Sequence, residues 1–260
     1  MIELARVLPD ASNSAAWPNP TGGGLVLGLA RTNEELEAIQ RMRYKIFTED
    51  MNVVFPEALD GVDSDRFDPW CEHIMVKEVD SGRVVGTYRL LSPANAVKAG
   101  GYYSESEFDI SSLDSLRGQM AEVGRSCIHA DYRNGSVIML LWSGIAALMQ
   151  QDGFRYVLGC ASVSLRDDGV TAAEVWRLAR KMLNKNTGQP IVEPRHRYPV
   201  ERLNSELPAR VPPLIKGYLK LGATICGEPA WDPDFNAADF PILLDLESMD
   251  PRYRRHFGLA

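Results

Sequence analysis

The apolar positions of the chain fall into runs that alternate between the spacing of helices and the spacing of strands. Ser136–Gln151 carries apolar residues every three to four positions, which predicts a helix with a core-facing side. Leu25–Ala30 and Tyr156–Ala161 are short apolar runs that predict buried strands. His73–Val79 and Val84–Leu91 flank an Asp-Ser-Gly turn and predict a hairpin.

The rest of the pattern continues this alternation. The further predicted elements are a helix starting at Asn33, a strand over Ala121–His129, helices over Thr171–Asn184 and Pro212–Leu221, and strands over Thr224–Cys226 and Phe240–Leu246. Hairpins combined with a helical crossover predict a mixed central sheet flanked by helices, an α/β (α+β) fold.

The two ends differ from the middle in composition. Residues 1–24 are rich in Ala, Asn, Pro and Gly and predict a flexible N-terminal tail before a single domain over residues 25–248. Residues 249–260 predict a basic C-terminal tail. No signal peptide and no apolar run of about 20 residues is present, which indicates a cytoplasmic protein. Arg252, Arg254, Arg255 and Phe257 leave open either an ordinary tail or peripheral contact with the inner membrane face.

Charge narrows the choice of partners. The net charge of −7 argues against nucleic-acid binding. The stretch Thr171–Lys220 nevertheless carries a local excess of +6. Its basic residues indicate either a solvated helix face or a docking surface for an acidic protein or anionic lipid, and the candidates are Arg177, Arg180, Lys181, Arg195 and Arg197.

The four cysteines show no metal-binding spacing. Cys71, Cys127, Cys160 and Cys226 lie in apolar segments without a CxxC pair, which is typical of reduced core residues. We therefore expect no bound metal.

The segment Glu122–His129 carries the most chemical information. Glu122 and Arg125 are three residues apart and point to opposite faces of a regular strand, so a bulge is needed to aim both at one site. The turn that follows leads into the helix at Ser136. Unpaired backbone N–H groups at such a helix start bind phosphate, which makes Arg133, Asn134, Gly135 and Ser136 candidate acyl-donor contacts.

These motifs resemble the GNAT superfamily and, within it, the acyl-carrier-protein-dependent ornithine N-acyltransferases of ornithine-lipid synthesis. A more distant similarity links the chain to acyl-homoserine-lactone synthases. The resemblance covers roughly Leu25 to Phe240. Besides the strand and turn above, the stretches that carry it are Arg43–Glu49, Asp65–Asp68, Cys71–His73, Gly86–Leu91, Tyr102–Asp109 and Pro213–Tyr218.

The resemblance implies transfer of a (3-hydroxy)fatty acyl group from a carrier-protein phosphopantetheine thioester, or from acyl-CoA, to the α-amine of ornithine. The product would be lyso-ornithine lipid, and no cofactor would stay bound. GNAT members that use acetyl-CoA hold its pyrophosphate with a glycine-rich loop, whereas this chain has Ser136 and Ile138 at the glycine positions counted from Arg133. This departure favours the single phosphate of a carrier protein, and an acidic carrier protein would suit the basic stretch.

The resemblance also implies roles for individual residues. Glu122 is the candidate general base, with a structural pairing to Arg125 or Arg89 as the alternative. A backbone N–H near Cys127 or Ile128 would stabilise the oxyanion.

On the substrate side, the resemblance singles out Asp65 and Asp68, from an acidic cluster that starts at Asp60, as contacts for a cationic amino acid. Arg43, Arg89 and Arg125 would either bind the substrate carboxylate or buttress the acidic loop through bidentate pairs.

Three other functions stay open at this point. They are an acetyl-CoA-dependent acetyltransferase, a synthase of other N-acyl amino acids or acyl-homoserine lactones, and a non-catalytic module that binds carrier protein or lipid.

Overall fold

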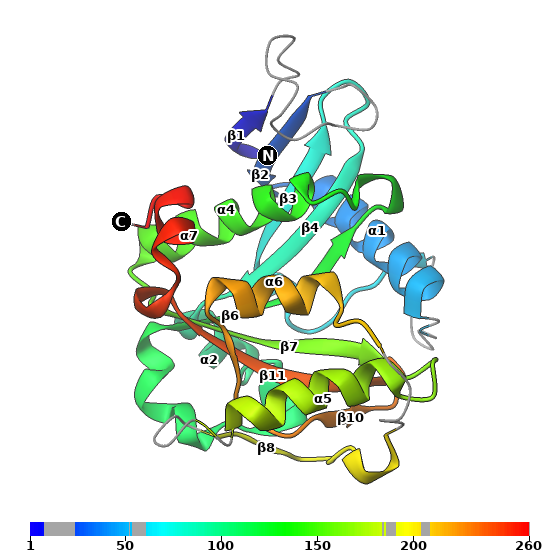
Figure 1. The fold of residues 1–260 in the computed structure, drawn as a ribbon. Helices are drawn as coiled ribbons and strands as arrows, with labels where there is room; N and C mark the ends of the chain where they lie inside the picture. The colour runs from blue at the N-terminus through cyan, green and yellow to red at the C-terminus, as the bar shows by residue number, and fades with distance from the viewer. Residues whose placement is uncertain are drawn as a thin grey trace.

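The computed structural model describes residues 1–7, 24–51, 53, 61–183, 185, 191–203 and 209–259. Its described part is built on a nine-stranded sheet in the order β1-β2-β3-β4-β6-β7-β11-β10, with β9 also paired to β11 (Figure 1). The strands are β1 (Ile2–Val7), β2 (Leu25–Leu29), β3 (Glu72–Glu78), β4 (Val84–Leu91), β6 (Met120–Ile128), β7 (Tyr156–Ser164), β9 (Thr224–Ile225), β10 (Ala230–Asp232) and β11 (Ala237–Asp245). A separate pair joins β5 (Phe108–Asp109) to β8 (Glu193–Pro194).

Every strand pair in the large sheet is antiparallel except β6 with β7, which run parallel. The helices are α1 (Asn33–Met51), α2 (Pro93–Ala99), α3 (Ser104–Glu107), α4 (Ser136–Asp152), α5 (Val170–Leu183), α6 (Pro213–Leu221) and α7 (Pro251–His256). In Figure 1, α4, α5 and α6 lie in front of the sheet. This confirms the predicted mixed sheet flanked by helices.

The alternation of side chains along β3 explains why helices cover both faces of the sheet. Ile74 and Val76 belong to the main core together with Leu141 of α4. Met75, between them in sequence, belongs to a second cluster with Ile39 of α1. Because successive strand residues point to opposite faces, α4 and α1 pack on opposite sides of this strand.

One glycine fixes how closely α4 approaches the sheet. A Cβ atom at Gly86 of β4 would lie 2.2 Å from Cγ1 of Val137, in the first turn of α4. The helix start therefore rests directly on the β4 backbone, and any larger residue at Gly86 requires the helix to shift.

Most predicted elements are confirmed within one to three residues, including the hairpin (β3 and β4), the strand β6 and the helices α4, α5 and α6. The flexible N-terminal tail needs a correction. Ile2–Val7 forms β1 and pairs antiparallel with β2, because the edge of β2 offers unpaired backbone groups that an extended segment satisfies. Residues 8–23 of the predicted tail lie outside the described residues.

The C-terminal tail is also corrected. Pro251–His256 forms α7, and Tyr253, Phe257 and Leu259 pack against the main core. Phe257, for which the sequence left open contact with lipid headgroups, lines the cavity described below. Its apolar ring gains more from burial in the core than from exposure beside the basic residues.

Candidate active site

The predicted bulge is present in β6. Thr87 pairs with Cys127 and Arg89 pairs with Gly124, so that Arg125 and Ser126 together face the single residue between Thr87 and Arg89. Arg125 adopts φ +51°, a conformation that non-glycine residues rarely take. The bulge places Arg125 on the same cavity as Glu122, as the sequence required.

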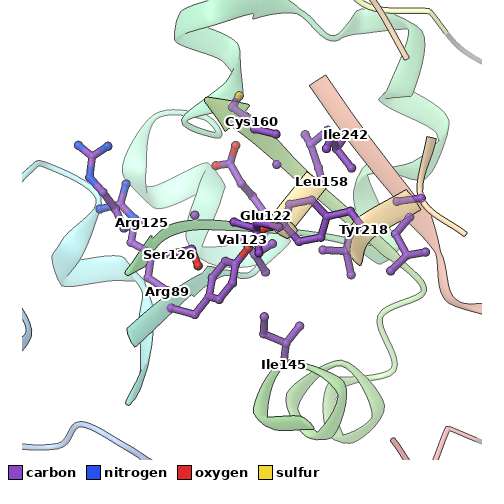
Figure 2. Close-up of a pocket in the computed structure, with 18 of the residues that line it drawn as sticks. Arg89, Glu122, Val123, Arg125, Ser126, Ile145, Leu158, Cys160, Tyr218 and Ile242 are labelled. Atoms are coloured by element: carbon purple, nitrogen blue, oxygen red, sulfur yellow. Dashed lines mark hydrogen bonds between the residues drawn. The ribbon is translucent and has the colours of Figure 1, made fainter. Parts of the chain in front are cut away.

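A cavity of about 300 Å³ opens where β6 and β7 separate (Figure 2). The two strands pair only from Met120 to Glu122, with Tyr156 to Leu158. Beyond these three pairs, Val123–Ser126 of β6 and Gly159–Ser162 of β7 line the cavity. The space between the separating strands therefore forms the centre of the site.

The cavity has a charged part and an apolar part. Figure 2 shows Arg89, Glu122 and Arg125 beside the first, and Ile145 and Ile242 beside the second. The apolar part is lined by residues from α4, α6, β11 and the chain end, namely Trp142, Ile145, Ala146, Met149, Ile215, Leu221, Ile242, Leu244, Leu246, Met249 and Phe257. Such a lining suits a hydrocarbon chain, because each buried methylene contributes about 0.8 kcal/mol.

Glu122 is buried at the charged part of the cavity, with 5% of its surface exposed. Its Oε1 accepts hydrogen bonds from the backbone N–H and the hydroxyl of Ser104, and its Oε2 accepts one from the Tyr103 N–H at 2.6 Å. Burial raises the pKa of Glu122, while these hydrogen bonds oppose the rise. One acceptor position on Oε2 remains for a ligand or water.

An arginine-paired cluster, which we define as Asp63, Asp65 and Asp68 with Arg43, Arg89 and Arg125, lies next to the charged part. Arg43 is fully buried and contacts both oxygens of Asp68, at 3.0 and 2.7 Å. Asp68 also accepts from Arg89 at 2.8 Å and from Gln40 at 2.9 Å. These donors hold the pKa of Asp68 well below its usual range, against the opposing effect of burial.

Asp65 completes this cluster. Its carboxylate accepts from Arg89 at 2.7 Å and from Arg125 at 3.2 Å, and it caps the backbone N–H groups of Phe67 and Asp68. Three arginines therefore neutralise three aspartates. Of the two alternatives left open by the sequence, the geometry favours arginines that buttress the acidic loop. Arg89 and Arg125 also line the cavity. Asp60 lies outside the described residues.

The remaining predicted donor contacts lie away from the cavity. Along β6, the lining of the cavity ends at Ser126 and includes neither Cys127 nor Ile128. It also lacks the four residues of the predicted phosphate turn, Arg133, Asn134, Gly135 and Ser136. The oxyanion and phosphate roles of these residues stay predictions.

Side chains of the phosphate turn already make contacts within the protein. The Asn134 side chain accepts from the Ser136 N–H at 3.0 Å, and Arg133 forms an ion pair with Asp50. Gly135 has φ +100°, which lets the turn enter α4. A phosphate would have to displace the Asn134 oxygen to reach this helix start.

The basic docking candidates lie on the surface, and three are on α5. Arg177 pairs with Glu174 at 2.6 Å, whereas Arg180 and Lys181 are exposed further along the helix. Arg195 donates to the Glu105 carbonyl at 2.7 Å, and Arg197 pairs with Glu201 and Glu228. Exposed pairs of this kind contribute about 0–1 kcal/mol, so they leave these arginines free to exchange partners.

Sequence reasoning missed a second acidic cluster, which we define as Glu107, Asp232 and Asp239. Asp232 and Asp239 line the cavity, and Asp239 is 1% exposed. Burial is the largest cause that raises the pKa of Asp239 to about 7 and that of Glu107 to about 7. A single acidic residue inside the apolar run Ala237–Leu244 was the signal that could have revealed Asp239.

A sheet whose parallel strands separate around a cavity with an apolar and a charged part fits an acyltransferase of the GNAT class. A family model described as an acetyltransferase (GNAT) domain matches residues 42–143. An N-acyl amino acid synthase from uncultured soil microbes has the same fold, with a TM-score of 0.52 and 13% sequence identity over 86% of this chain and 90% of that one.

Closer relatives identify the branch. The L-ornithine N(alpha)-acyltransferase of Brucella abortus is 33% identical over 95% of this chain and 94% of its own length. The enzyme of the same name from Agrobacterium fabrum is 34% identical over 91% of this chain and 86% of its own. The chain belongs to the L-ornithine N(alpha)-acyltransferase family.

Two further observations concern ligands and location. Within the described ranges, no three His, Cys, Asp or Glu side chains are arranged to hold a metal ion. No helix in the described part of the chain is long and apolar enough to cross a membrane.

Proposed function

We propose that this protein transfers a 3-hydroxyacyl chain from the thioester of an acyl carrier protein to the α-amine of ornithine. The observation that carries the proposal is the two-part cavity at the separation of β6 and β7. Its apolar part accommodates an acyl chain, and its charged part accommodates a zwitterionic amino acid. Family membership supplies the reaction and the acceptor.

The chemistry needs a neutral amine, because an α-amine has a pKa of about 8 and is largely protonated near pH 7. In the proposed mechanism the amine attacks the thioester carbon and its proton passes to Glu122, directly or through a water at the open acceptor position of Oε2. The tetrahedral oxyanion then collapses and the carbon–sulfur bond breaks. The phosphopantetheine sulfur leaves as a thiolate, which takes up the proton held by Glu122. Burial raises the pKa of Glu122, which makes its carboxylate a stronger proton acceptor.

A hydroxyl pair supports the 3-hydroxy part of the proposal. The hydroxyls of Tyr88 and Tyr218 form a hydrogen bond and lie within the cavity lining. Tyr88 is the residue opposite the bulge at Arg125 and Ser126. A hydroxyl near the thioester end of an acyl chain would meet this pair, whereas a plain methylene would leave the pair unchanged.

A carrier protein is favoured as donor by two features of the surface. The Asn134 side chain accepts from both the N–H and the hydroxyl of Ser136, so this helix start offers less to the pyrophosphate of CoA. The exposed cations of α5 would attract the acidic surface of a carrier protein.

The test mixes the purified protein with 3-hydroxyacyl-carrier protein and ornithine, and follows thiol release and product mass. We expect N-acyl-ornithine, and slower turnover with the same acyl chain on CoA. Equal turnover with both donors would remove the carrier protein from the proposal. Product with acetyl-CoA but with no long-chain thioester would overturn it.

A further inference from the structure

The second acidic cluster differs from the arginine-paired cluster beside the same cavity. Within the described part of the chain, Glu107, Asp232 and Asp239 form no ion pair, although two of them line the cavity. Asp232 Oδ1 accepts only from the backbone N–H groups of Asp234 and Phe235, at 2.9 and 3.0 Å. Asp239 faces Ser162 across the β7–β11 ladder, and its Oδ1 is buried without a hydrogen-bond partner.

An unpartnered buried carboxylate oxygen is costly to a folded protein. Burial raises the pKa of Asp239 most, and the like charges of Asp232 and Glu107 raise it further, against the opposing effects of Ser162 and Arg125. A ligand that brings positive charge and N–H donors would satisfy Oδ1 and relieve the repulsion together. The chemical class that fits is an organic ammonium, which carries three donors and one charge.

The position of this cluster relative to Arg125 defines the kind of ammonium ligand. The guanidinium carbon of Arg125 lies 5.0 Å from the ring centre of Phe235, which follows Asp232 in the β10–β11 turn. It also lies 5.5 Å from the ring centre of Tyr103, whose N–H holds Glu122. The cation Arg125, the candidate base Glu122 and two carboxylates of the second acidic cluster therefore lie around the same cavity. An amino acid with a cationic side chain offers the matching set of groups.

Resting on the proposed function, we infer that Asp239, supported by Asp232, binds the side-chain ammonium of the acceptor amino acid and so selects ornithine over neutral amino acids of equal length. Arg125 then faces the acceptor carboxylate, and the α-amine is left toward Glu122. The role assigned from sequence to Asp65 and Asp68 moves to Asp239, because the first two already bind arginines.

The experiment compares Asp239→Asn with Asp234→Asn, a matched change at an exposed acid in the same β10–β11 turn. Each variant is assayed with ornithine and with norvaline, which has the same carbon chain without the terminal amine. We expect Asp239→Asn to raise the KM for ornithine about tenfold or more, because a charged hydrogen bond is lost. Its kcat should stay within about twofold. The kinetic constants for norvaline should not change, and Asp234→Asn should resemble the wild type with both acceptors.

Where norvaline turns over too slowly, its inhibition constant against ornithine replaces its KM, with the same expectation. Equal losses with ornithine and norvaline would overturn the inference, because they indicate a base or a structural role for Asp239. An unchanged KM for ornithine would also overturn it. A different result would overturn the proposed function itself, namely a wild type that makes no acyl-ornithine from any long-chain thioester. Asparagine keeps the shape of aspartate, and a melting curve checks that the variant is folded.

Discussion

Two groups of three acidic residues lie beside the same cavity, and they differ in what surrounds them. In the arginine-paired cluster, every aspartate contacts an arginine, and the pKa of Asp65 and of Asp68 is lowered. In the second acidic cluster, no described cation pairs with the carboxylates, and all three pKa values are raised. The difference teaches that acidic residues near a cavity are candidates for binding a cation only if the protein has not already neutralised them.

Glu122 lies at the charged part of the cavity, and its substitution should have the largest effect. We expect Glu122→Gln to lower kcat by about 10²- to 10⁴-fold, because the amine loses its proton acceptor. Steady-state kinetics over a range of pH measures this. Near-normal turnover of the variant at every pH would show that Glu122 is structural.

The companion variant Ser104→Ala tests the same residue through its pKa. The Ser104 hydroxyl stabilises the charged carboxylate and so lowers the pKa of Glu122. Removing it should move the acidic limb of the kcat/KM profile to higher pH, since the base must be deprotonated to act.

A substitution in the arginine-paired cluster should lower the stability of the fold. Arg43→Leu removes the buried guanidinium that pairs with both Asp63 and Asp68 and leaves each carboxylate with one cation fewer. We expect the free energy of unfolding to fall by about 3–5 kcal/mol. Arg41→Leu is the control, because Arg41 pairs with Glu37 at the surface of the same helix and should cost at most about 1 kcal/mol. Denaturant titration measures both. A loss below about 1 kcal/mol for Arg43→Leu would mean that this cluster does not hold the acidic loop.

Removing a charge from the second acidic cluster should stabilise the protein, whereas removing Arg43 from the arginine-paired cluster should destabilise it. The folded pKa of Asp239 is raised to about 7, so the folded state holds a proton that the unfolded state has already lost between about pH 4 and pH 7. Stability of the wild type should therefore fall as pH rises through this window. We expect Asp239→Asn to abolish that part of the slope and to melt higher than the wild type at pH 7. Parallel melting curves against pH for the two proteins would contradict the raised pKa.

The smallest effect concerns the acyl chain. Tyr218→Phe removes one hydroxyl of the pair with Tyr88, and we expect the preference for 3-hydroxyacyl over plain acyl donors to fall about two- to tenfold. Competition between the two donors gives this ratio, with Tyr198→Phe, outside the cavity lining, as the control. If both variants keep the wild-type ratio, the pair does not recognise the hydroxyl.

The sequence was sufficient to predict a bulge in β6, because Glu122 and Arg125, three residues apart, cannot share a face of a regular strand. It was also sufficient for α4, whose apolar spacing is strong. The sequence could not place Asp239 at the site. This residue is 117 positions after Glu122, and it lies beside the cavity only because β11 pairs with β7 along nine residues. The sequence also could not show that both carboxylate oxygens of Asp68 already accept hydrogen bonds, since one of the donors, Arg43, comes from a different element, the helix α1.

The position of the acyl group on ornithine tests the central claim most directly. Tandem mass spectrometry of the product distinguishes an acyl group on the α-amine from one on the side-chain amine. If Asp239 holds the side-chain ammonium while the α-amine faces Glu122, all product should be acylated at the α-position. Acylation of the side-chain amine, or a mixture of both products, would contradict the account.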